Sequence, residues 1–521
     1  MASSETTPLL GDAGTAGLTT GTNDEDGLPE TRGTFARQLS ALDGFALLIS
    51  IVIGSGIFSS PGPVDANVPS PGAALLVWLL GGLLAWTGAL TMAELGTAFP
   101  GEGGIQPYLT HIYGEVFGFL AAWSWIVAVM PATLAILSIV FVESVYSSLG
   151  VNDANPGITH KLFSLLVLVV VGTANSISTK TSTRLGSFFV LVKLLSIFLL
   201  IVAGLTVVFV YLGSHGKDLG GGDWHSKGWF DARDTVLPDG SKFDWGKAAT
   251  WQMLGFYCTA LYGALWAYSG WDKANYVAAE LKNPSKQLPL SINTAIPTII
   301  VCYVAANAVY YILLPWKVIS ITDAAAVTAV TNFLGKGVAY FATVLICLVV
   351  AGSALGNSFV AGRMTVAASN KRWLPRFLGT VGQIGPWRVS KGSEGEAANE
   401  AMDKGETPIN ALVLSTILSA IYILVGNMRV LLTFNGLGEY TFFFLTVLGS
   451  IILRWREPEL RRPVKPFILI PIVFAVISGF VVVRGAIFAP VQACILLGIW
   501  GVGLIFYFAR LYAFREVWHR E

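Results

Sequence analysis

The chain has 521 residues, of which 54% are hydrophobic and 12% are charged, and its formal net charge is +1. Soluble globular proteins carry about 25% charged residues, so this composition excludes that class and predicts a polytopic α-helical membrane protein. A net charge close to zero also argues against a nucleic acid as a partner.

The four cysteines predict neither a metal site nor a disulfide framework. They lie in apolar segments without C-x-x-C spacing, which is typical of small core residues. They are Cys258, Cys302, Cys347 and Cys494.

The first 40 residues are rich in Gly, Thr, Ser and acidic residues, so we expect residues 1–40 to form a disordered cytosolic tail. No basic stretch followed by an apolar run, as in a cleavable signal peptide, is found there. The stretch from Glu5 to Leu10 has the spacing of an acidic dileucine sorting signal. Such a signal favours a vacuolar or lysosome-like membrane, but matches this short also arise by chance, so the plasma membrane remains an alternative.

Apolar runs of about 20 residues, each long enough to cross the hydrocarbon core of a bilayer, recur along the rest of the chain. They predict a first repeat of five helices at 41–213, an extracellular loop at 214–250, a second repeat at 251–453, two further helices at 454–510 and a C-terminal tail at 511–521. The twelve predicted spans fall at about 43–66, 71–98, 116–147, 161–177, 185–212, 251–279, 289–314, 333–368, 409–426, 430–453, 467–485 and 490–510.

An even number of spans puts both ends of the chain on one side, and the basic residues indicate which side. If the N-terminus is cytosolic, most Lys and Arg fall in cytosolic loops, for example Arg454, Arg456, Arg461 and Arg462. We therefore expect both termini in the cytosol. The 214–250 loop is interpreted as a linker rather than as a lid over the entrance.

The first span contains a break. Its sequence from Leu48 to Pro61 places two glycines around Ser55 and ends in a proline. A break in a membrane helix is tolerated only against protein or a wet cavity, because the freed backbone groups need partners. The second half-helix then offers N–H groups to an anion and the first half offers carbonyls to a cation, which together suit a zwitterion.

A second break is predicted at Trp266-Ala267-Tyr268-Ser269-Gly270-Trp271, in the sixth span. Two broken helices at matching places in two halves indicate the substrate site of a transporter with inverted repeats. An odd number of spans in each half would give the two halves opposite orientations. We therefore expect a 5+5 inverted repeat whose helices 1 and 6 are broken.

Ionisable residues inside the spans are candidates for function, because burying a charge in a membrane is costly. Lys193 lies in the middle of the fifth span, where we favour a fixed positive charge over a structural lysine. Asp272 could sense protons, although a helix-capping role is equally compatible with its position. Glu94 and Glu280 are candidates for charges of an inner gate.

Polar and aromatic residues complete the candidate site. Ser353 and Asn357 lie in the eighth span, where packing between helices is slightly favoured over a role in binding. Three aromatic residues at the second break are too many for anchoring in lipid headgroups, so one of them, Trp266, is expected to close over the substrate.

The sequence lacks the motifs of several enzyme classes. No GxxxxGK[ST], HExxH or GxSxG pattern is present. This argues against an ATP-driven pump and against a membrane protease. We also expect no cofactor and no metal.

Five stretches together carry a resemblance to a known group of proteins. In their order and spacing they resemble the amino acid–polyamine–organocation superfamily in its L-type amino acid transporter branch, most of all its fungal members of the methionine-permease kind. The stretches are Ile53–Phe58, Ala93–Thr97, Ala267–Trp271, Glu280–Pro284 with Leu288-Pro289, and Leu453–Trp455 with Arg462–Lys465.

The resemblance implies a site in which the substrate carboxylate binds the N–H groups of Ser55 and Gly56, next to Gly54. Trp266 stands at the place of the family's aromatic gate, and Lys193 matches a lysine that replaces a sodium ion. No disulfide-linked heavy subunit is expected, because residues 148–160 contain no cysteine. The carbonyls implied to meet the substrate ammonium are those of Val52, Ile53, Trp266, Ala267 and Ser269.

The leading hypothesis is a sodium-independent carrier of neutral amino acids, such as methionine or leucine, that works by alternating access. Exchange, uniport and proton coupling all remain open. The first alternative is a permease for cationic amino acids or polyamines, for which Asp272 is the only acidic candidate close to the breaks. The second is a receptor that binds an amino acid without transporting it, which short tails argue against.

Overall fold

A computed structural model describes residues 40–99, 104–151, 157–177, 179–214, 216, 218–237, 240–273, 281–380 and 407–518. The predictions for the tail before Ser40, for the dileucine stretch from Glu5 to Leu10 and for Glu280 lie outside the described residues.

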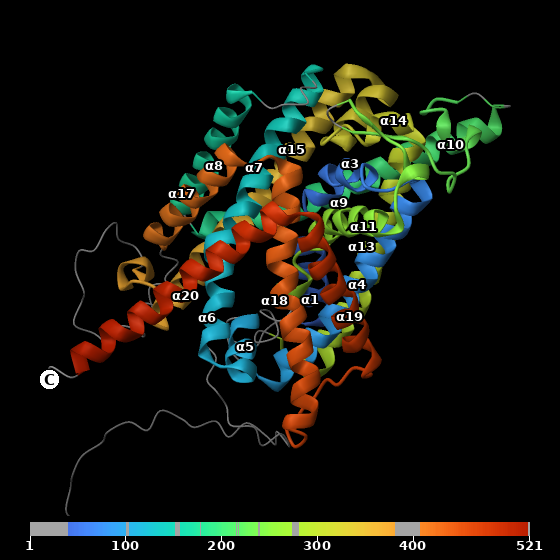
Figure 1. Ribbon diagram of the computed structural model, residues 1–521. Helices are drawn as coiled ribbons and strands as arrows, with labels where there is room; N and C mark the ends of the chain where they lie inside the picture. Colours follow the sequence, from blue (N-terminus) through green and yellow to red (C-terminus); the bar gives the residue numbers. More distant parts are fainter. Residues whose placement is uncertain are drawn as a thin grey trace, which may run out of the picture. The chain divides into compact units, whose positions relative to one another are not determined.

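Nearly all of the described chain is helical, as the apolar runs predict (Figure 1). The elements are α1 (Ala41–Val52), α2 (Gly56–Ser59), α3 (Pro61–Asp65), α4 (Pro71–Ala98), α5 (Ile105–Tyr113), α6 (Glu115–Ser124), η1 (Trp125–Val129), α7 (Met130–Leu149), α8 (Ile158–Ile177), α9 (Thr179–Gly213), α10 (Asp223–Ser226), β1 (Thr235–Val236), β2 (Lys242–Phe243), η2 (Trp245–Lys247), α11 (Thr250–Tyr268), η3 (Trp271–Lys273), α13 (Pro284–Leu313), α14 (Trp316–Ile319), α15 (Ala325–Asn370), η4 (Arg376–Gly379), α17 (Ile409–Val425), α18 (Met428–Arg456), α19 (Leu469–Phe488) and α20 (Pro490–Trp518). The only sheet in the described part is the antiparallel pair of β1 and β2.

Nine of the described helical stretches are long and apolar enough to cross a membrane on their own. The remaining three predicted spans are the broken first helix, the sixth span α11, and α17 with 17 residues. The first helix is short because it is interrupted after Val52. The prediction of an all-α polytopic protein is therefore confirmed, and its broken helices open the two sets of five spans.

Local sequence explains where several helices begin and end. Ser70 accepts a hydrogen bond from the N–H of Ala73 at the start of α4, and Asn427 does the same for Val430 at the start of α18. Each satisfies one of the N–H groups that a helix start leaves without a partner. Gly150 adopts a φ of 79° after α7, a left-handed conformation that favours glycine at a helix end.

The two breaks differ in their backbone geometry. Helix α1 ends at Val52 and α2 begins at Gly56, so residues 53–55 connect the two half-helices. In the second half of the chain, helix α11 ends at Tyr268, and Gly270 follows with a φ of 107°. That positive φ lets the chain turn sharply before η3, which most other residues would do only under strain.

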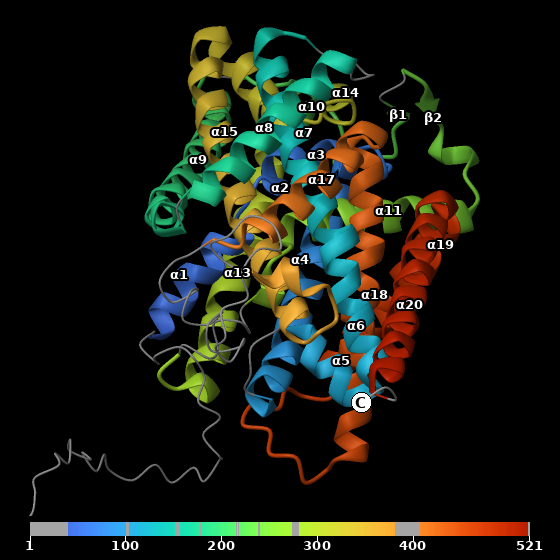
Figure 2. The ribbon, with the colours of Figure 1, turned by 90° about the vertical axis from the view of Figure 1, so that its left-hand side faces the viewer.

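Helices from the two repeats interleave in the bundle. Helix α15 packs along α7, while α13 packs along both α4 and α1. Elements α3, α10 and α14 gather at one end of the bundle, and α5 lies towards the other end (Figure 2). This packing places the two breaks side by side between α7, α13 and α15.

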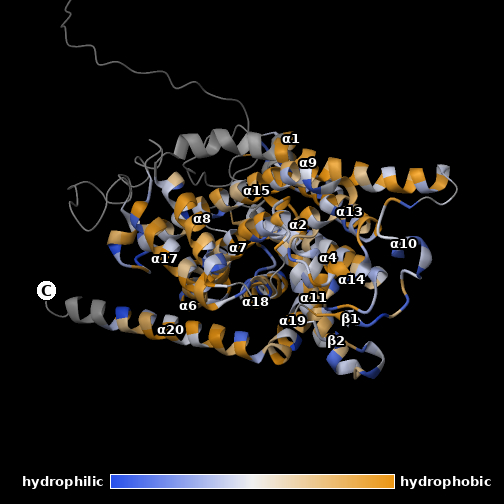
Figure 3. Ribbon diagram, turned by 90° about the horizontal axis from the view of Figure 1, so that it is seen from above, coloured by the Kyte–Doolittle hydropathy of each residue, from blue (hydrophilic) through white to orange (hydrophobic). Residues whose placement is uncertain are grey.

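The outer helices present apolar side chains to their surroundings, as expected of a lipid-facing surface. Helices α9 and α20 lie on opposite sides of the bundle and are largely hydrophobic (Figure 3). Phe198 and Phe209 of α9 are exposed, as are Ile505 and Phe508 of α20. Because such apolar surface is unfavourable in water, it supports a position inside a bilayer.

Candidate functional site

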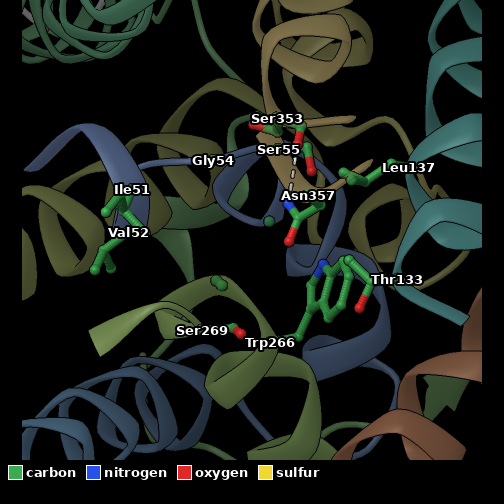
Figure 4. A pocket seen from close by; sticks show the side chains of 12 residues that line it. Ile51, Val52, Gly54, Ser55, Thr133, Leu137, Trp266, Ser269, Ser353 and Asn357 are labelled. Atoms are coloured by element: carbon green, nitrogen blue, oxygen red, sulfur yellow. Dashed lines mark hydrogen bonds between the residues drawn. The ribbon is translucent and has the colours of Figure 1, made fainter. Parts of the chain in front are cut away.

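A small cavity lies between the two breaks (Figure 4). Its volume is about 50 Å³, against the roughly 10–15 Å³ that one water molecule requires. None of the lining side chains from the described part of the chain is charged. The cavity is lined by Ile51, Val52, Gly54, Ser55, Gly56, Thr133, Leu137, Trp266, Ala267, Ser269, Ser353 and Asn357.

The two breaks touch each other at Gly56. A Cβ atom built on Gly56 would lie against the Cα of Ala267 and 2.8 Å from its Cβ, closer than packed side chains allow. Gly54 differs, since a Cβ there would be 3.5 Å from the nearest atom, Ser353 Oγ. Glycine at position 56 is therefore required by the close approach of the two backbones.

The start of α2 supplies the donors of the site. The first N–H groups of any helix have no carbonyl one turn upstream, and they carry the positive end of the helix dipole. In α2 these groups belong to Gly56 and its neighbours, and the lining of the cavity includes both Ser55 and Gly56. An anionic group in the cavity would thus meet oriented backbone donors.

A tyrosine hydroxyl joins the free backbone groups of both breaks. Tyr303 of α13 is fully buried, and its hydroxyl lies within hydrogen-bonding distance of the carbonyls of Val52 (2.9 Å) and Ala267 (3.1 Å). One O–H can be donated only once, so the two carbonyls share it and keep lone pairs for another donor.

The rest of the cavity wall is polar on two sides. Trp266 and Ser269 lie on one side, and Ser55, Ser353 and Asn357 lie on the other (Figure 4). The indole N–H of Trp266 and the hydroxyl of Ser353 are buried without a hydrogen-bond partner among the described residues. Because unpaired buried polar groups are unfavourable, these two atoms are suited to receive polar atoms of a ligand.

Comparison with known proteins identifies the family of the protein that contains this site. Residues 39–510 match the amino acid permease family. The chain belongs to this family. It is 29% identical to the human b(0,+)-type amino acid transporter 1 over 479 residues, which cover 91% of this chain and 87% of that protein.

Two further relatives have similar sequence identity and coverage. The permease is 30% identical to the mouse Asc-type amino acid transporter 1 over 477 residues, 91% of this chain and 80% of that protein. It is 28% identical to the human large neutral amino acids transporter small subunit 2 over 480 residues, 91% of this chain and 81% of that protein. The permease is therefore an amino acid transporter rather than an enzyme, and the resemblance to the L-type branch is confirmed.

The structure places the other predicted site residues around the cavity rather than in it. Lys193 is buried on α9 and Asp272 is buried in η3, but neither lines the cavity. Helix α9 packs against α13 and α15, and η3 packs against α1 and α4. Seven of the eight residues predicted to bind substrate line the cavity. The eighth, Ile53, is buried next to the cavity.

Glu94 of the permease is part of a buried ion-pair cluster at the end of the bundle opposite α14. Arg454 donates two hydrogen bonds to its carboxylate, one of 2.9 Å from Nε to Oε1, and the Nε of Arg462 lies 3.2 Å from the same oxygen. Exposed fractions are 1% for Glu94 and 7% and 5% for the two arginine side chains. The cluster connects α4 of the first repeat with α18 and the segment that follows it.

At the other end, the 214–250 loop is tied to both repeats. Arg233 forms an ion pair of 2.5 Å with the fully buried Asp65 of α3 and donates to the carbonyl of Trp316 in α14. Tyr311 of α13 donates to the same carboxylate oxygen. Asp223 accepts a hydrogen bond from the N–H of Trp316. This segment therefore closes over the α3 and α14 end of the bundle.

Sequence reasoning missed several residues of the site. Tyr303 and Thr133 read as ordinary core positions, because a tyrosine or threonine in an apolar span gives no pattern of its own. For Ser353 and Asn357 the sequence slightly favours packing over binding, and both residues line the cavity. Glu439 does not line the cavity, but its carboxylate accepts a hydrogen bond from Ser269, which does. An acidic residue in the middle of a predicted span is a signal that could have indicated it.

Proposed function

We propose that this permease is a sodium-independent carrier of neutral amino acids, such as methionine or leucine, that works by alternating access. The observation that carries the proposal is the cavity between the two breaks, which combines oriented backbone groups of both signs with uncharged side chains. A zwitterionic substrate needs N–H donors for its carboxylate and carbonyl acceptors for its ammonium. A neutral substrate side chain needs no charged partner. The uncharged lining of the cavity fits this class better than a ligand with a charged side chain.

In the proposed complex, the substrate carboxylate accepts hydrogen bonds from the N–H groups of Ser55 and Gly56. The substrate ammonium donates to carbonyls of both breaks, those of Val52 and Ile53 on one side and of Trp266, Ala267 and Ser269 on the other. Tyr303 supports this arrangement because its hydroxyl already sits between the carbonyls of Val52 and Ala267. Trp266 acts as the gate, and the buried Lys193 provides the fixed positive charge.

Alternating access further requires that the two ends of the bundle open in turn. The Glu94 cluster is proposed as the inner gate, and the contacts of Arg233 and Asp223 would hold the outer end. Both termini are proposed to be cytosolic, in the plasma membrane or a vacuole-like membrane. The absence of cysteine from residues 148–160 supports a carrier without a disulfide-linked heavy subunit.

Asp272 does not support the cationic alternative. A carboxylate that selects a cationic side chain has to face the cavity, and Asp272 lies outside the lining. Its burial in η3 instead agrees with a structural position near the second break.

The test uses purified protein in sodium-free liposomes with labelled methionine and leucine. Vesicles preloaded with unlabelled substrate are compared with empty vesicles, each with and without an inward proton gradient. Faster uptake into preloaded vesicles that ignores the gradient would identify an exchanger, and concentrative uptake driven by the gradient would identify a proton symporter. Uptake of lysine or a polyamine without uptake of methionine or leucine would refute the proposal.

A further inference from the structure

One buried carboxylate lies directly behind the cavity wall. Glu439 is in the middle of α18, with an exposed fraction of 7%. The hydroxyl of Ser269 donates a hydrogen bond of 3.4 Å to its Oε1 atom. Ser269 itself lines the cavity, whereas Glu439 does not. A single hydroxyl therefore separates the carboxylate from the cavity.

The position of Ser269 leaves its hydroxyl oxygen able to accept a hydrogen bond from the cavity. Ser269 follows α11 at the second break, next to the free carbonyls of that helix end, and its own backbone has left the helical conformation. A hydroxyl has one hydrogen and two lone pairs. Because the hydrogen points to Glu439, the lone pairs are left for a donor on the cavity side.

A hydrogen bond to a charged acceptor strengthens the next hydrogen bond in a chain. The effect is larger in the interior of a protein, where the effective dielectric constant is low. An ionised Glu439 would polarise the Ser269 hydroxyl and make its oxygen a better acceptor for a positively charged N–H group. None of the cavity-lining residues in the described chain is charged, so Glu439 would be a source of negative charge just outside the lining.

We propose that Glu439 is a positioning residue for the substrate ammonium, to which it transmits negative charge through the hydroxyl of Ser269. This inference rests on the proposed function, in which the ammonium binds at the second break. In this proposal, Glu439 helps to recognise the α-ammonium group of the substrate and does not recognise the side chain of the substrate. Substrates and inhibitors that carry an α-amine should therefore depend on Glu439, whatever their side chain.

The experiment measures inhibition of labelled methionine uptake by three compounds in proteoliposomes containing wild-type or E439Q protein. They are methionine, the α-hydroxy acid analogue of methionine, which lacks the amine, and 3-(methylthio)propylamine, which lacks the carboxylate. The E439Q variant keeps the size of the side chain and an acceptor for Ser269 but loses the charge. We expect the KM for methionine and the inhibition constant of the amine to rise about tenfold, the loss typical of one charge-assisted hydrogen bond, with little change in kcat.

Inhibition by the hydroxy acid should stay within about twofold of wild type, since it has no ammonium for the charge to act on. The E439D variant should recover part of the methionine affinity. S269A should weaken methionine binding in the same direction as E439Q, and the double variant should be no weaker than E439Q alone. The matched control is E143Q, because Glu143 pairs with His160 on α7 and α8 away from the cavity.

Three results would overturn the inference. An unchanged methionine KM in E439Q would remove Glu439 from the site. An equal loss for all three compounds would indicate a structural role. If lysine is added as a fourth compound, loss of its inhibition with unchanged methionine affinity would show that Glu439 recognises a cationic side chain instead. If wild-type protein transports neither methionine nor leucine, the proposed function fails first, and that result is visible before any variant is compared.

Discussion

At the scale of single residues, the site is built from backbone atoms that two breaks expose and that one side chain organises. Gly56 allows the two breaks to touch, and Tyr303 connects the carbonyls of Val52 and Ala267. Neither residue carries a charge. Each acts by fixing where free N–H and C=O groups lie, which is the basis of two predictions.

The first prediction concerns the close contact at Gly56. Gly56→Ala should reduce methionine uptake by at least about a hundredfold, because the added methyl group would push Ala267 and the second break out of position. Uptake per molecule is measured in proteoliposomes after the amount of folded protein has been matched. Gly54→Ala is the control, since its Cβ would be 3.5 Å from Ser353 Oγ, and it should retain more activity. Equal activity of the two variants would argue against a required backbone contact.

The second prediction concerns the hydroxyl of Tyr303. Tyr303→Phe leaves two buried carbonyls without this partner, and each unsatisfied buried group costs about 1–3 kcal/mol. We expect lower thermal stability in detergent and weaker methionine binding. Tyr268→Phe removes a buried hydroxyl that has no hydrogen-bond partner among the described residues, so it should have a much smaller effect. If both variants lose the same stability, the bridge at Tyr303 has no special importance.

At the scale of elements, the 214–250 segment shows how a loop between spans becomes part of the bundle. The carboxylate of Asp223 in α10 accepts a hydrogen bond from the backbone N–H of Trp316 in α14. It also forms an ion pair of 2.6 Å with Lys227. Burial by itself would raise the pKa of Asp223, but the hydrogen bonds from Lys227 and Trp316 outweigh it and hold this pKa below its ordinary value. The segment is therefore docked by specific contacts and not only connected to the helices on either side.

The third prediction follows from the direction of that pKa shift. A carboxyl group whose pKa is lowered by folding stabilises the docked loop at every pH above its ordinary pKa of about 3.9, and this contribution is lost as the pH falls through the lower folded value. Hydrogen exchange at Trp316 should thus be equally slow at about pH 7 and pH 5 after correction for intrinsic rates.

The variant Asp223→Asn should speed the exchange at Trp316 already at neutral pH, because it loses the charge that Lys227 and the N–H group contact. Asp244→Asn is the matched control, since Asp244 accepts from Gly246 within the same loop and does not contact α14. Faster exchange in the control variant would show that the loop responds to any lost carboxylate.

At the scale of the whole molecule, the two ends of the bundle are held by different elements. The α14 end is closed by a loop, whereas the opposite end is joined by the buried cluster of Glu94, Arg454 and Arg462. Removing one partner from a buried ion pair leaves uncompensated charge, which typically costs about 3–5 kcal/mol. If the cluster is the inner gate, as proposed, its charges would have to be hydrated before that end could open.

The fourth prediction tests that cluster. Glu94→Gln should lower the thermal unfolding temperature in detergent, and Arg454→Gln should do the same. The effects of the two changes should not add in the double variant, because both break one interaction. Glu457→Gln is the control, as Glu457 pairs with His111 and Arg456 at the surface, where such pairs contribute about 0–1 kcal/mol. Additive effects of the two core variants would mean that the cluster is not a unit.

The amino-acid sequence by itself determined the membrane class, the helical spans and both breaks. These features depend on local properties, namely apolar length, glycine and proline positions and the resemblance carried by short motifs. Span boundaries were predicted well where capping signals are local, as for 71–98, which agrees with α4 residue for residue. Ser55, Gly56, Trp266 and Ser269, which flank the two breaks in the sequence, lie in the cavity wall.

Only the tertiary structure decided which distant residues meet at those breaks. Tyr303 reaches carbonyls 251 and 36 positions away, and Glu439 meets a hydroxyl 170 positions away. Ser353 and Asn357 became cavity residues because α15 packs along α7 beside the first break. Such contacts arise from helix packing over long sequence separations, and a single sequence has no periodicity that records them.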